Sequence, residues 1–174
     1  MHKKDPNCPC CQGVSPTKII LQHIDNVLRT GWSDISVGGE PPYNYSVGLG
    51  LTFGEEVGDF VLIGIPHERA HNILWELVNS YLNKKKKLKD DDILDIATAP
   101  SMAKVLSYNA ETWGKWFNYG VAMSEILYGH PRMKMTQIVY PDKCGKWPWE
   151  KGYSIRADWQ PMLYPNPVEM VVRS

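Results

Sequence analysis

The stretch from Tyr43 to Tyr81 constrains the fold more than any other part of this chain. Tyr43 to Leu49 alternates large apolar side chains with small or polar ones, which is typical of a half-buried strand. Phe60 to Ile65 is a continuous apolar run, which indicates a central strand of a sheet. Pro66 ends this run and opens a helix, whose apolar face comprises Ala70, Ile73, Leu74, Leu77, Val78 and Tyr81. Two strands followed by an amphipathic helix are therefore expected.

Weaker patterns on either side predict the remaining elements. Ser15 is a suitable N-cap and Pro16 a suitable first residue for a helix that ends near Arg29. Further strands are expected at Trp32–Val37, Ile93–Ile96, Ala103–Tyr108 and Met135–Tyr140, and a third helix at Glu111–Leu127. Gly120 falls inside that last helix, which predicts either a break or close packing.

This order of elements predicts an α+β domain. We expect a curved, mostly antiparallel sheet packed against two or three helices, over residues 15–174, after an N-terminal arm over residues 1–14. The core is expected to include Ile63, Ile73, Leu74, Leu77 and Val139.

Charge and hydropathy disfavour several classes of protein. The 174 residues include 19 basic and 19 acidic side chains, so no global basic field exists to hold nucleic acid. The lysines of residues 84–89 are followed by Asp90, Asp91 and Asp92, which cancel much of their field. No apolar run approaches the roughly 20 residues of a membrane-spanning helix, and Met1 to Pro6 lacks the apolar segment of a signal peptide. We expect a cytoplasmic protein with no membrane partner, and we disfavour nucleic acid as a partner.

Tryptophan is unusually frequent. The chain has seven Trp and nine Tyr, and five of the seven Trp lie at or after Trp113. Large rings with one polar tip either fill a core and pin loops, or line a ligand cleft. Both interpretations stay open from the sequence.

Residues 67–71, His-Glu-Arg-Ala-His, match the H-E-x-x-H signature of zinc peptidases. His67 and His71 would share one helical face and could both reach a Zn²⁺ ion, while Glu68 could act as the base on a bound water. Glu68 is equally explained by the favourable interaction of an acid with a helix N-terminus. A zinc site also needs a third ligand, for which His130, Glu111 and Asp142 are the candidates. A zinc-dependent hydrolase is therefore the alternative function.

Three thiols, Cys8, Cys10 and Cys11, lie within the N-terminal arm. Clustered thiols in a cytosolic protein indicate metal binding or redox sensitivity rather than structural disulfides. One interpretation is a reactive or incidental tail, and the other is a site for zinc or another soft metal. The fourth ligand of such a site would come from His2, His23 or Cys144.

No other segment matches a known catalytic apparatus. The chain lacks a Gly-x-Ser-x-Gly elbow, a phosphate-binding P-loop and a dinucleotide fingerprint. The glycines of Gly48-Leu49-Gly50 are expected to mark a bulge or turn that opens no helix.

Several short elements together resemble a known family. They are Gly31-Trp32, the Tyr45, Gly48 and Leu49 element, Gly64-Ile65-Pro66, and Gln137 with Pro141-Asp142 and Pro148-Trp149. In this order they resemble domain-of-unknown-function family 4262, a set of small, mostly bacterial and phage proteins, over approximately Ile24 to Pro161. The family commonly has Trp where this chain has Tyr140, and Pro-Glu where it has Gly58-Asp59. Its counterpart of Asn83 to Asp92 is usually shorter.

The resemblance implies a fold but no settled activity, and it leaves open whether the protein is an enzyme. The positions it marks for ligand binding are Tyr45, Gln137, Asp142, Trp149 and Gln160. These are polar or amphipathic residues at strand ends and in loops, where binding residues tend to lie. We expect a binding module for a small polar ligand or a protein partner, with a phage- or defence-associated role as one interpretation.

Overall fold

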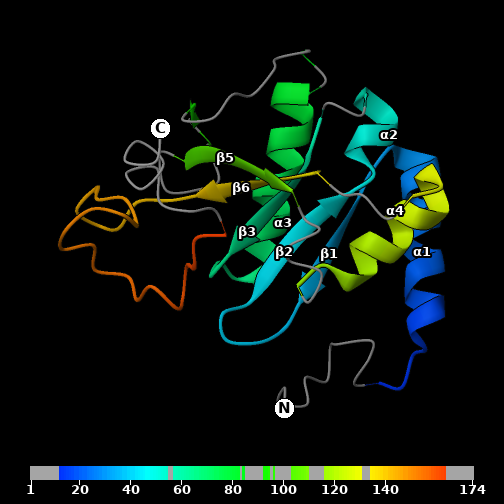
Figure 1. The fold of residues 1–174 in the computed structure, drawn as a ribbon, viewed down its shortest axis with the longest axis horizontal. Coiled ribbons are helices and arrows are strands. Elements are labelled where there is room, and N and C mark those ends of the chain that lie inside the picture. Colours follow the sequence, from blue (N-terminus) through cyan, green and yellow to red (C-terminus); the bar gives the residue numbers. More distant parts are fainter. Residues whose placement is uncertain are drawn as a thin grey trace.

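The computed structural model describes residues 12–54, 57–82, 84, 92–94, 96, 103–109, 116–130 and 134–163. In chain order the elements are α1 (Pro16–Thr30), β1 (Ser33–Val37), β2 (Tyr43–Val47), α2 (Leu49–Phe53), β3 (Asp59–Ile63), α3 (His67–Leu77), the π-helical turn η1 (Val78–Leu82), β4 (Ile93–Leu94), β5 (Ala103–Asn109), α4 (Asn118–Tyr128) and β6 (Lys134–Val139). Figure 1 shows their arrangement. The Cys-containing part of the arm and most of the lysine-rich segment lie outside the described residues.

One mixed sheet organises these elements. Its strand order is β1-β2-β3-β6-β5-β4. Every neighbouring pair is antiparallel except β3 and β6, which run parallel with Val61 opposite Gln137. The expected α+β class with a mostly antiparallel sheet is confirmed. The described part of the chain has four α-helices, one more than the upper expectation, because α2 was not foreseen.

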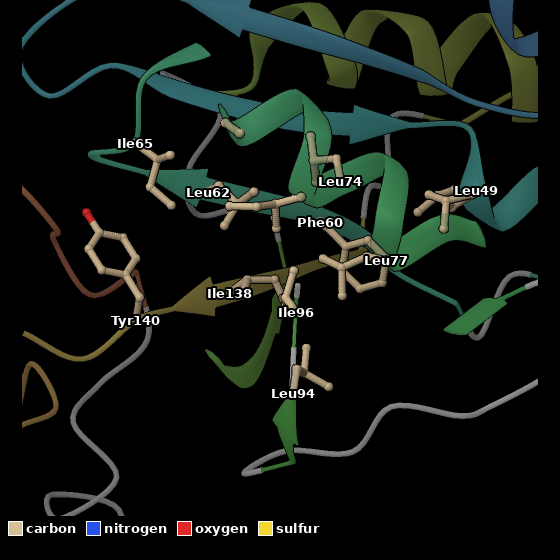
Figure 2. Close-up of a cluster of buried hydrophobic side chains, with 13 residues drawn as sticks. Leu49, Phe60, Leu62, Ile65, Leu74, Leu77, Leu94, Ile96, Ile138 and Tyr140 are labelled. Carbon is tan, nitrogen blue, oxygen red and sulfur yellow. The ribbon is translucent and has the colours of Figure 1, made fainter. Parts of the chain in front are cut away.

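The two faces of the sheet pack against different helices. Phe60 and Leu62 of β3 cluster with Ile73, Leu74 and Leu77 of α3 on one face (Figure 2). Val61 and Ile63 point the opposite way and cluster with residues of α1 and α4. Such alternation follows from the period of two in a strand, and burial on both faces explains why β3 is apolar throughout. The five expected core residues, Ile63, Ile73, Leu74, Leu77 and Val139, are all buried.

The helix boundaries follow from local chemistry. Ser15 caps α1, as expected, because its Oγ accepts a hydrogen bond from the amide of Lys18 at 3.3 Å. The third expected helix begins later than predicted, at Asn118, and residues 111–115 lie outside the described part of the chain. Gly120 is buried in it, and its amide donates to the hydroxyl of Tyr45 at 3.2 Å, so close packing is the correct interpretation.

Gly48 is the one place where the expectation for a glycine was wrong. The segment Gly48-Leu49-Gly50 does turn the chain, but it also opens α2 at Leu49. Gly48 has a φ of +91°, and a Cβ there would lie 2.5 Å from Cγ1 of Val27 on α1. Only glycine permits both this conformation and this approach, so α1 and the start of α2 pack directly on each other.

Candidate functional site

Asp142 organises the loop that follows β6. Its Oδ1 accepts hydrogen bonds from the amides of Cys144 at 2.8 Å and Lys146 at 3.0 Å, and its Oδ2 accepts from the amide of Ser154 at 2.8 Å. Burial by itself would raise the pKa of this carboxyl, but the donated hydrogen bonds prevail and lower the pKa to about 2. Asp142 thus holds the loop in shape and remains ionised at neutral pH.

Two buried glutamines attach the segment after this loop to β6. The side chain of Gln160 pairs with the backbone of Tyr140, accepting from its amide at 2.9 Å and donating to its carbonyl at 3.0 Å. Gln137 donates to the carbonyl of Pro161 at 2.8 Å and accepts from the amide of Leu163 at 2.9 Å. Each side-chain amide therefore pairs with one backbone N–H and one backbone carbonyl, as the backbone of a neighbouring strand would.

The other two positions marked by the family resemblance lie apart from each other. Tyr45 is fully buried under α4, where its hydroxyl accepts from Gly120. Trp149 is half-buried and stacks in parallel on Trp147, with ring centroids 5.7 Å apart. The structure thus places Gln137, Asp142, Trp149 and Gln160 around the end of β6 and Tyr45 elsewhere. Ligand binding by these five residues stays a prediction.

The loop after β6 also covers the turn that precedes α3. Tyr140 and Trp159 both donate to the carbonyl of Gly64, at 3.0 and 2.9 Å. In Figure 1 this loop extends beyond the tip of β6, and Figure 2 shows Tyr140 at the edge of the apolar cluster. Gly64, Tyr140 and Trp159, which are far apart in sequence, therefore meet immediately before the H-E-x-x-H segment.

The two histidines of that segment both contact the sheet. Nδ1 of His67 lies 2.6 Å from Oδ1 of Asn44, and Nδ1 of His71 lies 3.1 Å from Oδ1 of Asp34. Asp34, Asn44, His67 and His71 are called the histidine cluster below. Glu68 is exposed on α3, and the histidine cluster consists of two imidazoles and two side chains of the sheet.

Asn44 connects the members of the histidine cluster. Its side-chain Nδ2 donates to Oδ2 of Asp34 at 3.2 Å and to Oγ of Ser36 at 2.7 Å. Asn44 is fully buried. Ser36 lies directly opposite it in the sheet, so Asp34, Ser36 and Asn44 are all on the face of β1 and β2 that α3 approaches. A continuous chain of hydrogen-bonding groups therefore runs from His67 through Asn44 and Asp34 to His71.

Two tryptophans flank the histidine cluster. The ring of Trp32 stacks on that of His71, with centroids 6.4 Å apart and planes inclined by 17°. Trp75 follows His71 by one helical turn and is 57% exposed. Its ring offers a large apolar surface with one polar N–H to the solvent. The polar cluster thus has aromatic surface beside it.

Sequence reasoning found His67 and His71 but missed Asp34, Ser36 and Asn44. The polar positions of an alternating strand are normally taken to face solvent, and here α3 covers part of that face. The available signal was the occurrence of polar residues at alternate positions of two consecutive expected strands, Asp34 and Ser36 on one and Asn44 and Ser46 on the next.

The third ligand that a zinc site at His67 and His71 needs is not found among the described residues. Within the described ranges, no three or more His, Cys, Asp or Glu side chains are grouped so as to hold a metal ion. His130 stacks on Tyr128, and Asp142 is engaged by its loop, so neither completes a zinc site with the two histidines. Glu111 lies outside the described residues. Zinc binding at His67 and His71 stays a prediction.

The thiol cluster falls largely outside the structure's scope. Cys8, Cys10, Cys11 and His2 are not among the described residues. Of the distant ligands considered for them, His23 has its Nδ1 2.8 Å from Oγ of Ser33, and Cys144 is an exposed free thiol. Metal binding by these thiols stays a prediction.

The fold and the cluster together define a small α+β domain with a polar site between its β1–β2 edge and α3. The model of the DUF4262 family, a domain of unknown function, matches residues 26–154, and the protein belongs to this family. The predicted resemblance is thereby confirmed. The region expected from the sequence, approximately Ile24 to Pro161, is slightly longer than the matched one. No curated protein and no solved structure matches the chain. Among the helices of the described part, none is long and apolar enough to cross a membrane.

Proposed function

We propose that the protein is a small cytoplasmic binding module that holds a small polar ligand at the histidine cluster. The observation that carries this proposal is the attachment of both imidazoles to the sheet through Nδ1. With Nδ1 engaged, the remaining ring nitrogen, Nε2, is the atom that each histidine can offer to a ligand. The side chain of His71 is 51% exposed, so a ligand can reach it.

The energetics of the cluster favour a binding role. Burying polar groups such as Asn44 costs free energy unless every hydrogen-bonding atom is paired, and an apolar cluster would stabilise the fold as well or better. Here the network is paired on its inner side and ends in an exposed imidazole beside Trp32 and Trp75. A rigid polar network with an accessible end and adjacent aromatic surface is the usual composition of a small-molecule site.

Screening the full-length protein against metabolites and nucleotides by thermal shift tests the proposal. A ligand of this site should raise the melting temperature of the unmodified protein and should lose that effect in His71→Ala. His130→Ala is the matched control, because it removes an imidazole at the end of α4, away from the cluster. Native mass spectrometry of protein purified from its host is the second measurement. A ligand-free protein whose melting temperature responds to no compound would contradict the proposal.

The zinc-dependent hydrolase remains the second candidate, and one observation favours it. Metal-binding histidines commonly donate their other ring N–H to a carboxylate or amide oxygen, which is the arrangement of His67 and His71. A third protein ligand is what the described residues lack. Elemental analysis should then find about one tightly held metal per chain that disappears in His71→Ala. A metal-free preparation that stays metal-free after incubation with Zn²⁺ would exclude this function.

A further inference from the structure

The orientation of the Asn44 side chain follows from its neighbours. The two carboxylate oxygens of Asp34 can only accept hydrogen bonds, so the amide nitrogen of Asn44, its only donor, must face them. The same nitrogen also reaches Oγ of Ser36. The amide oxygen is therefore the atom that faces His67, at 2.6 Å from Nδ1.

This orientation determines the protonation of both histidines. An amide oxygen accepts only, so Nδ1 of His67 must carry the proton that closes the contact with Asn44. Nδ1 of His71 meets an oxygen of Asp34 at 3.1 Å and must likewise carry a proton. In their neutral forms, both rings therefore have an unprotonated Nε2 with a lone pair. Free neutral histidine in water prefers the opposite tautomer.

We infer that the ligand of the histidine cluster presents N–H or O–H hydrogen-bond donors and carries no negative charge where it meets the two imidazoles. This inference rests on the proposed function and specifies its ligand class: ammonium compounds and hydroxyl compounds rather than carboxylates or phosphates. Two lone pairs attract donors and repel anionic oxygens, and the charge of Asp34 behind His71 adds to both effects.

The tautomers can be measured directly on the unmodified protein. Long-range ¹H–¹⁵N NMR spectra of the full chain at pH 8 distinguish Nδ1–H from Nε2–H in each histidine ring. We expect Nδ1–H for His67 and His71. In Asn44→Ala, which removes the acceptor, His67 should move toward Nε2–H while His71 does not. Ser36→Ala is a milder variant should Asn44→Ala not fold, and should weaken the preference of His67 alone. Nε2–H in either ring of the unmodified protein would overturn the inference.

A matched pair of probes tests the ligand class. Ethanolammonium chloride carries donors and sodium acetate carries acceptors, and both are titrated at equal ionic strength while the Nε2 resonances are followed. We expect ethanolammonium to shift the resonances of His67 and His71, with His130 as the internal reference, and acetate to leave them in place. A larger response to acetate, or none to ethanolammonium, would overturn the inference. A failure of this inference can be distinguished from a failure of the proposed function. An anionic ligand found at the cluster by thermal shift would refute the inference but preserve the proposed function.

Discussion

Trp159 donates its indole N–H to the carbonyl oxygen of Gly64 across 2.9 Å, although the two residues are 95 positions apart in the chain. Tyr140 donates to the same carbonyl at 3.0 Å. Gly64 directly precedes Ile65 and Pro66, so this pair of bonds fixes the turn from which α3, and with it His67, begins. The aromatic residues after β6 therefore support the histidine cluster from outside it.

The contact with Trp159 makes Gly64 sensitive to substitution. Gly64 has a φ of +78°, and a Cβ there would lie 2.5 Å from the backbone oxygen of Trp159. Gly145 has nearly the same φ, +77°, but nothing within 4 Å of a Cβ. We expect Gly145→Ala to cost only the roughly 1–3 kcal/mol of an unfavourable backbone conformation, and Gly64→Ala to cost distinctly more. Urea denaturation of both variants measures this, and equal losses would contradict the packing.

Asp59 should make stability fall as pH rises toward neutrality. It is buried at the start of β3, which raises its pKa to about 7, against the hydrogen bonds from Ser46 and Leu49 that favour the charged form. Below about pH 4, Asp59 is protonated in both folded and unfolded chains, and its contribution to the free energy of unfolding is fully present. Between about pH 4 and 7, only the folded protein keeps the proton, so up to roughly 4 kcal/mol is lost.

Asp59→Asn should remove this pH dependence, because an amide keeps an acceptor for Ser46 and Leu49 without a titrating charge. Asp25→Asn, at an exposed position on α1, is the control and should leave the slope unchanged. Free energies of unfolding between pH 4 and 8 test this. A slope that survives in Asp59→Asn would show that another group is responsible.

Asp142 should act in the opposite direction at lower pH. Its pKa is lowered to about 2 in the folded protein, so its stabilising effect is present above the unfolded value near pH 4 and is lost as pH falls through about 2. Asp142→Asn should reduce stability at neutral pH and flatten the acid limb, because one amide oxygen cannot replace two carboxylate oxygens that accept three backbone amides. Thermal midpoints from pH 2 to 5 would show whether the limb persists.

The N-terminal arm should be separable from the domain. Ser15 provides the cap of α1, so a deletion of residues 1–13 leaves the helix start intact. We expect little change in thermal midpoint. If Cys8, Cys10 and Cys11 instead hold a metal against the body, a chelator and the deletion should lower the midpoint equally, since binding energy is then folding energy. The thermal midpoints of the full-length, truncated and chelator-treated proteins distinguish a separable tail from a metal site.

Much of the fold could be predicted because β2, β3 and α3 carry strong periodic patterns. Alternation in Tyr43 to Leu49 and the helical spacing of Ile73, Leu74 and Leu77 report directly on which side chains are buried. The short helix α2 escaped prediction because five residues are too few to show a helical period, and its start depends on the approach of Gly48 to Val27.

The candidate site was only half predictable. His67 and His71 are a local pattern at i and i+4, which a sequence displays. Asp34 and Asn44 join them through strand pairing and the placement of α3, and neither is local. For the same reason the burial and hydrogen bonding of Gln137 and Gln160 could not be foreseen, because their partners lie in a different segment of the chain.

The most direct test of the account is calorimetric titration of a ligand from the thermal-shift screen into the unmodified protein, His71→Ala and Trp149→Ala. His71 belongs to the histidine cluster, whereas Trp149 belongs to the loop after β6 that the family resemblance marks. We predict at least about tenfold weaker binding, roughly 1.4 kcal/mol, for His71→Ala and unchanged affinity for Trp149→Ala. Unchanged affinity in His71→Ala with loss in Trp149→Ala would place the ligand at the loop and contradict the account.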